Sequence, residues 1–212
     1  MLQLDADAPV RSLVASIMAG AQRGAEHTRE LLDYAGRGGG KFKPISLGAL
    51  LDDVLGTVRS LLKPHVSIAH GPLDEPLWLE GDHAQLKRLF VNLLRHSAES
   101  LAGEPGRVEL SITRTGDFCA ITIRDRGPGI DESTLSRMFE PFSSARYDGR
   151  GLRLISVPGI VERHLGQLDV SSVPGEGTRL SLRFPLCAAP DLPDRPEEVP
   201  RSHVGRVLVV DD

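Results

Sequence analysis

The stretch Asp125-Arg-Gly-Pro-Gly-Ile130 decides the fold, because a carboxylate ends an apolar run there and two glycines permit a tight turn. Four other short motifs accompany it in a fixed order. They are Asn92-Leu-Leu-Arg-His-Ser-Ala-Glu99, Phe139-Glu-Pro-Phe142, Gly149-Arg-Gly-Leu152 and Gly175-Glu-Gly-Thr178. One such motif alone indicates little, whereas five in this order, closed by a strand-like run over 179–185, indicate one fold built around one site.

The composition fits one ordinary domain with appendages. The chain has 212 residues, 40% apolar but only 4% aromatic, so we expect an aliphatic core. Its net charge of −4 lacks the basic excess that favours nucleic acid or membrane surfaces. Cys119 and Cys187 lie outside any C-x-x-C motif, which favours a reduced, cytoplasmic setting over a zinc or disulfide site. No apolar stretch reaches the roughly 18–20 residues of a membrane-spanning helix, so we expect no membrane segment in this chain.

Apolar spacing and breaker residues predict five helices. Their expected spans are residues 9–36, 47–62, 83–98, 131–138 and 151–164. Ser46 and Asp82 are the expected N-caps of the second and third helices. Pro158 should kink or delay the last helix, since proline lacks the backbone N–H that a helix interior needs.

Short alternating or continuous apolar runs predict six strands. Their expected spans are residues 66–69, 77–79, 107–114, 118–124, 167–173 and 178–184. The third and fourth strands should form a hairpin, and the last two should turn at 174–177. The predicted fold class is α+β, a two-layer α/β sandwich with helices on one face of a mixed, mostly antiparallel sheet, preceded by a long N-terminal helix.

Asp125 is a candidate for recognising a bound molecule through its carboxylate. A buried carboxylate at the end of an apolar strand can accept a hydrogen bond from an exocyclic amine. Gly127 and Gly129 give a turn there that bulkier residues would block. Taken alone, this motif could equally be an ordinary Asp-x-Gly turn.

Together the five motifs resemble the N, G1, F, G2 and G3 boxes of the ATP-binding domain of bacterial sensor histidine kinases, in the GHKL (Bergerat) ATPase superfamily. The resemblance covers roughly residues 12–186 and implies that ATP and Mg²⁺ are the cofactors. It implies catalytic roles for Asn92 and Glu99, and Mg²⁺ ligation by Asn92 and His96. The nucleotide-binding residues that it implies are Asp125, Gly127, Gly129, Phe139, Phe142, Arg146, Gly149, Gly151, Arg153, Gly177 and Thr178.

Asn92, His96 and Glu99 lie at positions i, i+4 and i+7, so they share one helix face. In the family pattern an asparagine that binds Mg²⁺ stands where this chain has His96, and an alanine stands where it has Ser97. Mg²⁺ prefers hard oxygen ligands, whereas imidazole suits zinc, copper or nickel. We therefore expect His96 to weaken Mg²⁺-ATP binding or, when protonated, to contact a phosphate. A helix histidine without a ligand is the alternative.

Arg153 replaces the third glycine of the family's second glycine box, at the point where backbone meets phosphate most closely. Its side chain could block the site or offer a cation to the phosphates, and a solvated arginine in an inactive site is the alternative. Arg146 is the expected cation of the lid over the nucleotide, which Phe139 and Phe142 would pin. Core packing alone would also account for the two phenylalanines.

The resemblance divides the chain into four segments. Residues 1–40 should hold the second helix of a dimerisation bundle, and 41–186 the catalytic domain. Residues 187–204 form a proline-rich linker, and 205–212 the first strand of a receiver domain. A fragment of a longer hybrid kinase is the simplest account of such an end, and a native acidic tail is the alternative. No histidine followed directly by an acidic residue occurs, so His27 is expected to be an ordinary helix-face residue.

The predicted function is therefore that of the ATP-binding catalytic domain of a two-component hybrid sensor histidine kinase. It would supply the γ-phosphoryl of ATP to a histidine outside this chain, for relay to a receiver aspartate. Expected partners are a receiver domain of the same or a cognate protein and the dimerisation helices of a second copy, with no nucleic acid. The alternative is a degenerate, non-catalytic pseudokinase that binds nucleotide weakly or not at all and acts as a scaffold, dimerisation or receiver-docking unit.

Overall fold

The computed structural model describes residues 12–18, 20, 21, 24, 25, 28, 40–101, 105–140 and 154–190. The described residues before residue 40 are all helical, as predicted for the first helix. The lid over 143–148 and the second glycine box over 149–153 lie outside the described residues. So do the linker beyond Pro190 and the receiver-like strand at 205–212.

Two sheets make up the β structure. The five-stranded sheet has the order β2 (Val66–His70), β4 (Gly106–Thr115), β5 (Phe118–Arg124), β7 (Gly177–Pro185), β6 (Gln167–Val173). Its first pair is parallel and the other three pairs are antiparallel. A separate antiparallel pair joins β1 (Lys43–Ser46) to β3 (Trp78–Gly81). The predicted hairpins at 107–124 and 167–184 are thereby confirmed.

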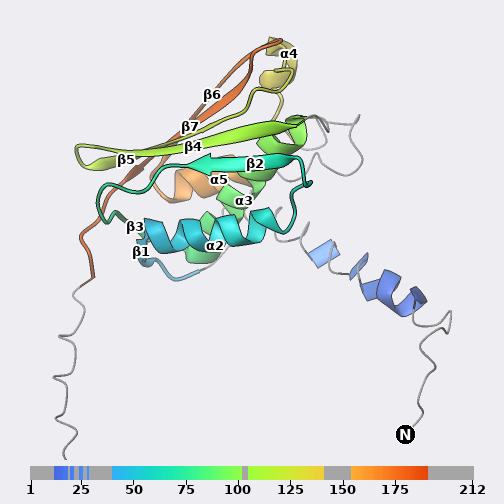
Figure 1. Ribbon diagram of the computed structural model, residues 1–212. Coiled ribbons are helices and arrows are strands. Elements are labelled where there is room, and N and C mark those ends of the chain that lie inside the picture. Colours follow the sequence, from blue (N-terminus) through green and yellow to red (C-terminus); the bar gives the residue numbers. More distant parts are fainter. Residues whose placement is uncertain are drawn as a thin grey trace, which may run out of the picture.

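Three helices cover one face of the large sheet, as Figure 1 shows. They are α2 (Leu47–Arg59), α3 (His83–Ser100) and α5 (Ser156–Arg163), while the short α4 (Glu132–Leu135) lies at one end of the sheet. The core between the layers is mainly aliphatic. Within it, the rings of Phe90 and Phe184 pack edge to face, with their centroids 6.4 Å apart. The predicted two-layer α+β sandwich is confirmed.

Both predicted N-caps are present. The Ser46 hydroxyl accepts a hydrogen bond from the backbone N–H of Ala49 at the start of α2. The Asp82 carboxylate accepts from the N–H groups of Ala84 and Gln85 at the start of α3. These caps satisfy N–H groups that the first helical turn leaves unpaired, so they fix where each helix begins.

Three helix predictions were wrong in extent. Helix α2 ends at Arg59, and Leu61 and Leu62 lie in the turn that follows, where Leu61 is half exposed. Helix α4 covers only Glu132–Leu135 of the expected 131–138, because the following residues form turns. Helix α5 begins at Ser156 and not at 151, which agrees with the expectation that Pro158 would kink or delay it. Pro158 stands third in its first turn, where the missing N–H costs nothing, so no kink is needed.

Strand β1 was not predicted. It has four residues, contains Pro44, and buries only Ile45 fully, so it carries no alternating pattern. Its pairing with β3 depends on the tertiary fold. Strand β3 itself covers 78–81, whereas 77–79 was expected.

His164 links the start of α3 to the end of α5. Its Nε2 accepts a hydrogen bond from the Asp82 backbone N–H at 3.0 Å, and its Nδ1 lies 2.7 Å from the Ile160 carbonyl oxygen, to which Nδ1–H donates. The ring is 3% exposed and stacks on Phe42, with ring centroids 4.8 Å apart. These contacts require the neutral imidazole, and burial lowers the pKa of His164 below its usual 6.5, with Arg163 adding to the effect.

Acid is therefore expected to weaken this junction. Because the pKa of His164 is lower in the folded than in the unfolded protein, its contribution to the free energy of unfolding is complete above pH 6.5. This contribution is lost as the pH falls below that value. We expect the stability difference between the wild type and His164→Asn, measured by urea unfolding, to shrink between about pH 7.5 and about pH 5. A difference that stays constant over this range would contradict the assignment.

Candidate functional site

The two carboxylate oxygens of Asp125 have different surroundings. Asp125 is 1% exposed and follows the last residue of β5. Its Oδ1 accepts hydrogen bonds from the backbone N–H groups of Gly127 at 3.0 Å and Thr178 at 3.3 Å. Its Oδ2 is buried without a hydrogen-bond partner among the described residues. One oxygen thus holds the loop, and the other is available to a donor on a bound molecule.

Glycines let the loop after β5 pack directly on the β6–β7 turn. Gly177 has φ +103°, and a Cβ there would collide with the Asp125 carbonyl oxygen. Gly129 has φ +67°, and a Cβ there would collide with the Val173 carbonyl oxygen. A backbone hydrogen bond of 2.7 Å from the Gly175 N–H to the Pro128 carbonyl joins the same two segments. Gly129 and Gly177 are therefore needed for the close approach of the two segments.

Ser172 is a structural member of the site that the sequence reasoning missed. Its hydroxyl accepts from the Ile130 N–H at 2.9 Å, donates to the Gly177 carbonyl at 3.0 Å, and lies 2.9 Å from the Thr178 hydroxyl oxygen. The sequence did hold a signal, because a tight turn at 174–176 places Ser172 directly opposite Thr178. Ser172 therefore positions both Thr178 and the loop that follows Asp125.

Helix α3 carries the predicted polar face. Asn92 is buried, while His96 and Glu99 are partly buried. Glu99 forms an ion pair with Arg95, whose Nε lies 3.4 Å from the Glu99 carboxylate oxygen. At its C-terminal end, α3 meets the Asp125 loop, since a Cβ built on Gly127 would lie 2.8 Å from the Ser100 hydroxyl. The helix and the loop therefore form two walls of one site.

The described residues fit a nucleotide base better than a metal ion. No group of three or more His, Cys, Asp or Glu side chains among them could hold a metal. Asn92 offers a hard amide oxygen of the kind Mg²⁺ prefers, but His96 offers imidazole nitrogen. The Asp125 Oδ2, in contrast, is suited to an exocyclic amine.

The remaining predicted site residues are only partly placed. Phe139 is partly buried and packs against the hydrophobic core. Phe142, Arg146, Gly149, Gly151 and Arg153 lie outside the described residues. The geometry therefore concerns the base end of the predicted site, and the roles expected at the phosphate end stay predictions.

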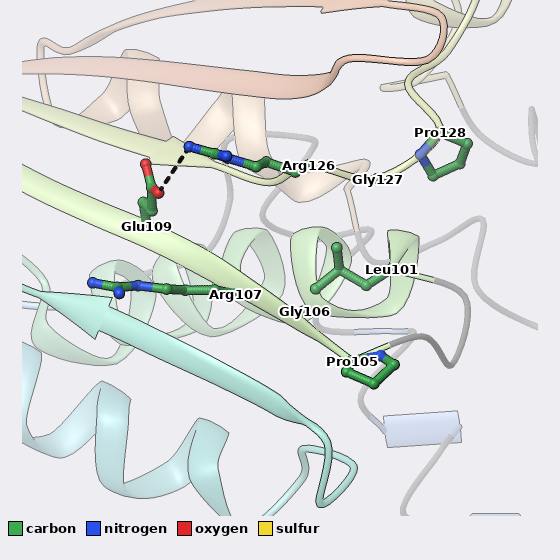
Figure 2. A pocket seen from close by; sticks show the side chains of 8 residues that line it. All are labelled: Leu101, Pro105, Gly106, Arg107, Glu109, Arg126, Gly127 and Pro128. Atoms are coloured by element: carbon green, nitrogen blue, oxygen red, sulfur yellow. Dashed lines mark ion pairs between the residues drawn. The ribbon is translucent and has the colours of Figure 1, made fainter.

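A cavity of about 630 Å³ lies beside the loop, as Figure 2 shows. Its lining residues are Leu101, Pro105, Gly106, Arg107, Glu109, Arg126, Gly127 and Pro128. Arg126 and Glu109, two of these lining residues, form an ion pair of 3.7 Å, in which the Arg126 side chain is 72% exposed and that of Glu109 44%. Gly127 lines this cavity but Asp125 and Thr178 do not, so the cavity adjoins the base end of the site on the side of the loop.

Gly177→Ala should destabilise the protein more than Gly175→Ala. Both glycines have positive φ, but a Cβ on Gly175 meets nothing within 4 Å, whereas one on Gly177 meets the Asp125 backbone. We expect a loss of about 1 kcal/mol for Gly175→Ala and about 3 kcal/mol for Gly177→Ala in urea unfolding. Equal losses would show that the close approach to Asp125 does not constrain the loop.

Comparison with known proteins identifies the family. Residues 81–188, half of the chain, match the family described as histidine kinase-, DNA gyrase B-, and HSP90-like ATPase. The chain belongs to this family, whose domain binds ATP.

Individual relatives include a sporulation kinase and a sensor histidine kinase. Sporulation kinase A of Bacillus subtilis is 33% identical over 140 residues, which are 64% of this chain and 23% of that protein. The structure resembles the mycobacterial sensor histidine kinase MprB with a TM-score of 0.60 and 25% identity, over 68% of this chain and 97% of that one. It shares the fold of full-length ShkA, solved with AMPPNP, at a TM-score of 0.70 and 22% identity, over 89% of this chain and 41% of that one.

The chain spans only part of its curated relatives, for example 23% of sporulation kinase A and 26% of the C4-dicarboxylate transport sensor DctS of Rhodobacter capsulatus. It corresponds to the ATP-binding catalytic domain of a histidine kinase. Within the described residues, no helix combines the length and the apolar character needed to cross a bilayer.

Proposed function

We propose that this chain binds ATP with the adenine amine on Asp125 Oδ2, and that its parent protein transfers the γ-phosphoryl to a histidine outside this chain. The observation that carries this proposal is the difference between the two Asp125 carboxylate oxygens. Oδ1 accepts from Gly127 of the loop and Thr178 of β7, whereas Oδ2 is buried and has no partner among the described residues. A buried acceptor of this kind is costly unless a donor reaches it. An amine on the base supplies that donor.

The base end of the proposed site consists of Asp125, Gly127, Gly129, Gly177 and Thr178. Thr178 is 5% exposed; its hydroxyl oxygen lies 2.9 Å from that of Ser172, and its backbone N–H donates to Asp125 Oδ1. Rigid supports on two sides keep the carboxylate in one orientation, which favours selective recognition of the base. Phe139, Phe142 and Arg146 are proposed to cover the nucleotide, and Gly149, Gly151 and Arg153 to approach its phosphates.

The described side chains supply only part of the oxygen ligands that Mg²⁺ prefers. Asn92 and Glu99 provide oxygen atoms, but Glu99 is paired with Arg95, and His96 is a poor ligand for Mg²⁺. We propose that Asn92 faces the phosphates and that any bound Mg²⁺ is held mainly by the nucleotide itself. Since phosphoryl transfer relies on charge neutralisation, this difference should lower the transfer rate.

Partner proposals rest on the N-terminal helical residues. Leu13, Ile17 and Met18 are about 60% exposed, and such a stripe commonly packs on another helix. We propose that residues 1–40 dimerise with a second copy and that residues 41–186 form the catalytic domain. The proline-rich run 187–204 would then lead to a receiver domain beginning at residue 205.

The second candidate is a pseudokinase scaffold. His96 and Arg153 stand where the family pattern has residues that serve Mg²⁺ and phosphate, and this observation favours loss of transfer. The two candidates agree on the fold and differ in nucleotide chemistry.

Displacement of a fluorescent ATP analogue tests the proposal. ATP and ADP should displace the analogue from the purified chain, whereas ITP and UTP should not, because their bases carry a carbonyl and no exocyclic amine that could donate to Oδ2. Equal displacement by all four nucleotides, or no binding of the analogue, would favour the scaffold. Acid-labile labelling of the parent protein by γ-labelled ATP would then test transfer to a histidine.

A further inference from the structure

Ser97 is a second buried polar group without a partner near the proposed base site. The side chain is fully buried at 0% exposure, and its hydroxyl makes no hydrogen bond within the part of the chain that the structure describes. A buried hydroxyl without a partner destabilises a fold, and serine is a poorer helix former than alanine. The family pattern has alanine at this position, so the serine is costly here unless something bound to the protein pairs with it.

A short series of contacts places Ser97 beside the Asp125 loop. The Ser100 hydroxyl donates to the Ser97 carbonyl at 2.8 Å, and the same hydroxyl lies 2.8 Å from where a Gly127 Cβ would be. The Gly127 N–H in turn donates to Asp125 Oδ1 at 3.0 Å. Ser97 therefore belongs to the part of α3 that packs on this loop, and the same region holds two buried polar groups that have no partner among the described residues.

The chemistry of adenine matches these two groups. Its amine is a donor, and ring nitrogen N1 beside it is an acceptor. A carboxylate oxygen can only accept, whereas a hydroxyl can donate. We propose that Ser97 reads the base together with Asp125, donating its hydroxyl hydrogen to N1 directly or through one water. This inference rests on the proposed function, because it concerns the same nucleotide.

Calorimetric titration of ADP and 1-deaza-ADP, which lacks the N1 acceptor, into the wild type and Ser97→Ala tests the inference. We expect the variant to bind ADP about five- to tenfold more weakly, the size of one neutral hydrogen bond. With 1-deaza-ADP the two proteins should bind equally. Without nucleotide, the variant should melt at the same temperature as the wild type or higher, since an unpaired hydroxyl is removed.

Ser156→Ala is the matched control, because Ser156 is equally buried and equally unpaired among the described residues. It should keep the wild-type affinity for ADP. The Ser97 assignment is wrong if the wild type and Ser97→Ala bind ADP equally well, or if Ser156→Ala weakens binding as much as Ser97→Ala does. In either case the proposed function still stands, because the wild type binds ADP. If the wild type binds no ADP, the proposed function fails with it.

Discussion

Replacing Asp125 by asparagine is expected to reverse the purine preference of the site. The acceptor role of Oδ1 toward the N–H groups of Gly127 and Thr178 fixes the orientation of the new amide. Its NH2 group then replaces Oδ2 and presents a donor to the adenine amine, which is also a donor. We expect ADP affinity to fall about 30- to 100-fold, the value of a hydrogen bond to a charged group.

Inosine diphosphate provides the decisive comparison, because it carries a carbonyl in place of the amine. Asp125→Asn should bind inosine diphosphate more tightly than the wild type does, with little change in melting temperature. Asp169→Asn, an exposed position on β6, is the control for the same change in net charge. Weaker binding of both nucleotides by Asp125→Asn, without a change in their ratio, would mean that Asp125 supports the loop but does not contact the base.

Replacing His96 by asparagine is expected to make nucleotide binding depend on Mg²⁺. Asparagine restores a hard oxygen donor one helical turn after Asn92, on the same face of α3. We expect Mg²⁺ to strengthen ATP binding by about threefold or less in the wild type and by about tenfold or more in His96→Asn, as one additional charge-assisted contact would.

His65→Asn is a matched control, since His65 lies in the turn before β2 and is exposed. It should leave the Mg²⁺ dependence of ATP binding unchanged. Strong Mg²⁺ dependence in the wild type would contradict the view that His96 impairs the metal site. The phosphate-contact alternative instead predicts that His96→Asn binds ATP more weakly than the wild type does when Mg²⁺ is absent.

Local chemistry made much of the fold predictable. Ser46 and Asp82 marked helix starts because their side chains replace missing backbone partners. The β4–β5 and β6–β7 hairpins followed from alternating residues around glycine-containing turns. Strand β1 was not predictable, since only its pairing with β3 makes it a strand. The end of α2 was also missed, because apolar spacing continued to Leu62 beyond the actual turn.

The candidate site was predictable in its residues but not in its contacts. The sequence placed a carboxylate after a strand, yet only the structure shows that Oδ1 accepts two hydrogen bonds and that Oδ2 has no partner within the part of the chain that is described. Ser172 and Ser97 went unassigned because a serine in a strand or helix has many ordinary roles. What distinguishes them is burial and pairing, which depend on segments far apart in the chain.

Adenine-nucleotide binding by this chain is the central claim, and isothermal titration tests it most directly. ATP and ADP would be titrated with and without Mg²⁺ into the wild type and into a double variant carrying His96→Asn and Arg153→Gly. We predict that the wild type binds ADP with little Mg²⁺ dependence and that the double variant gains Mg²⁺-dependent ATP binding. No heat of binding in either protein would contradict the account and leave the chain as a non-catalytic scaffold.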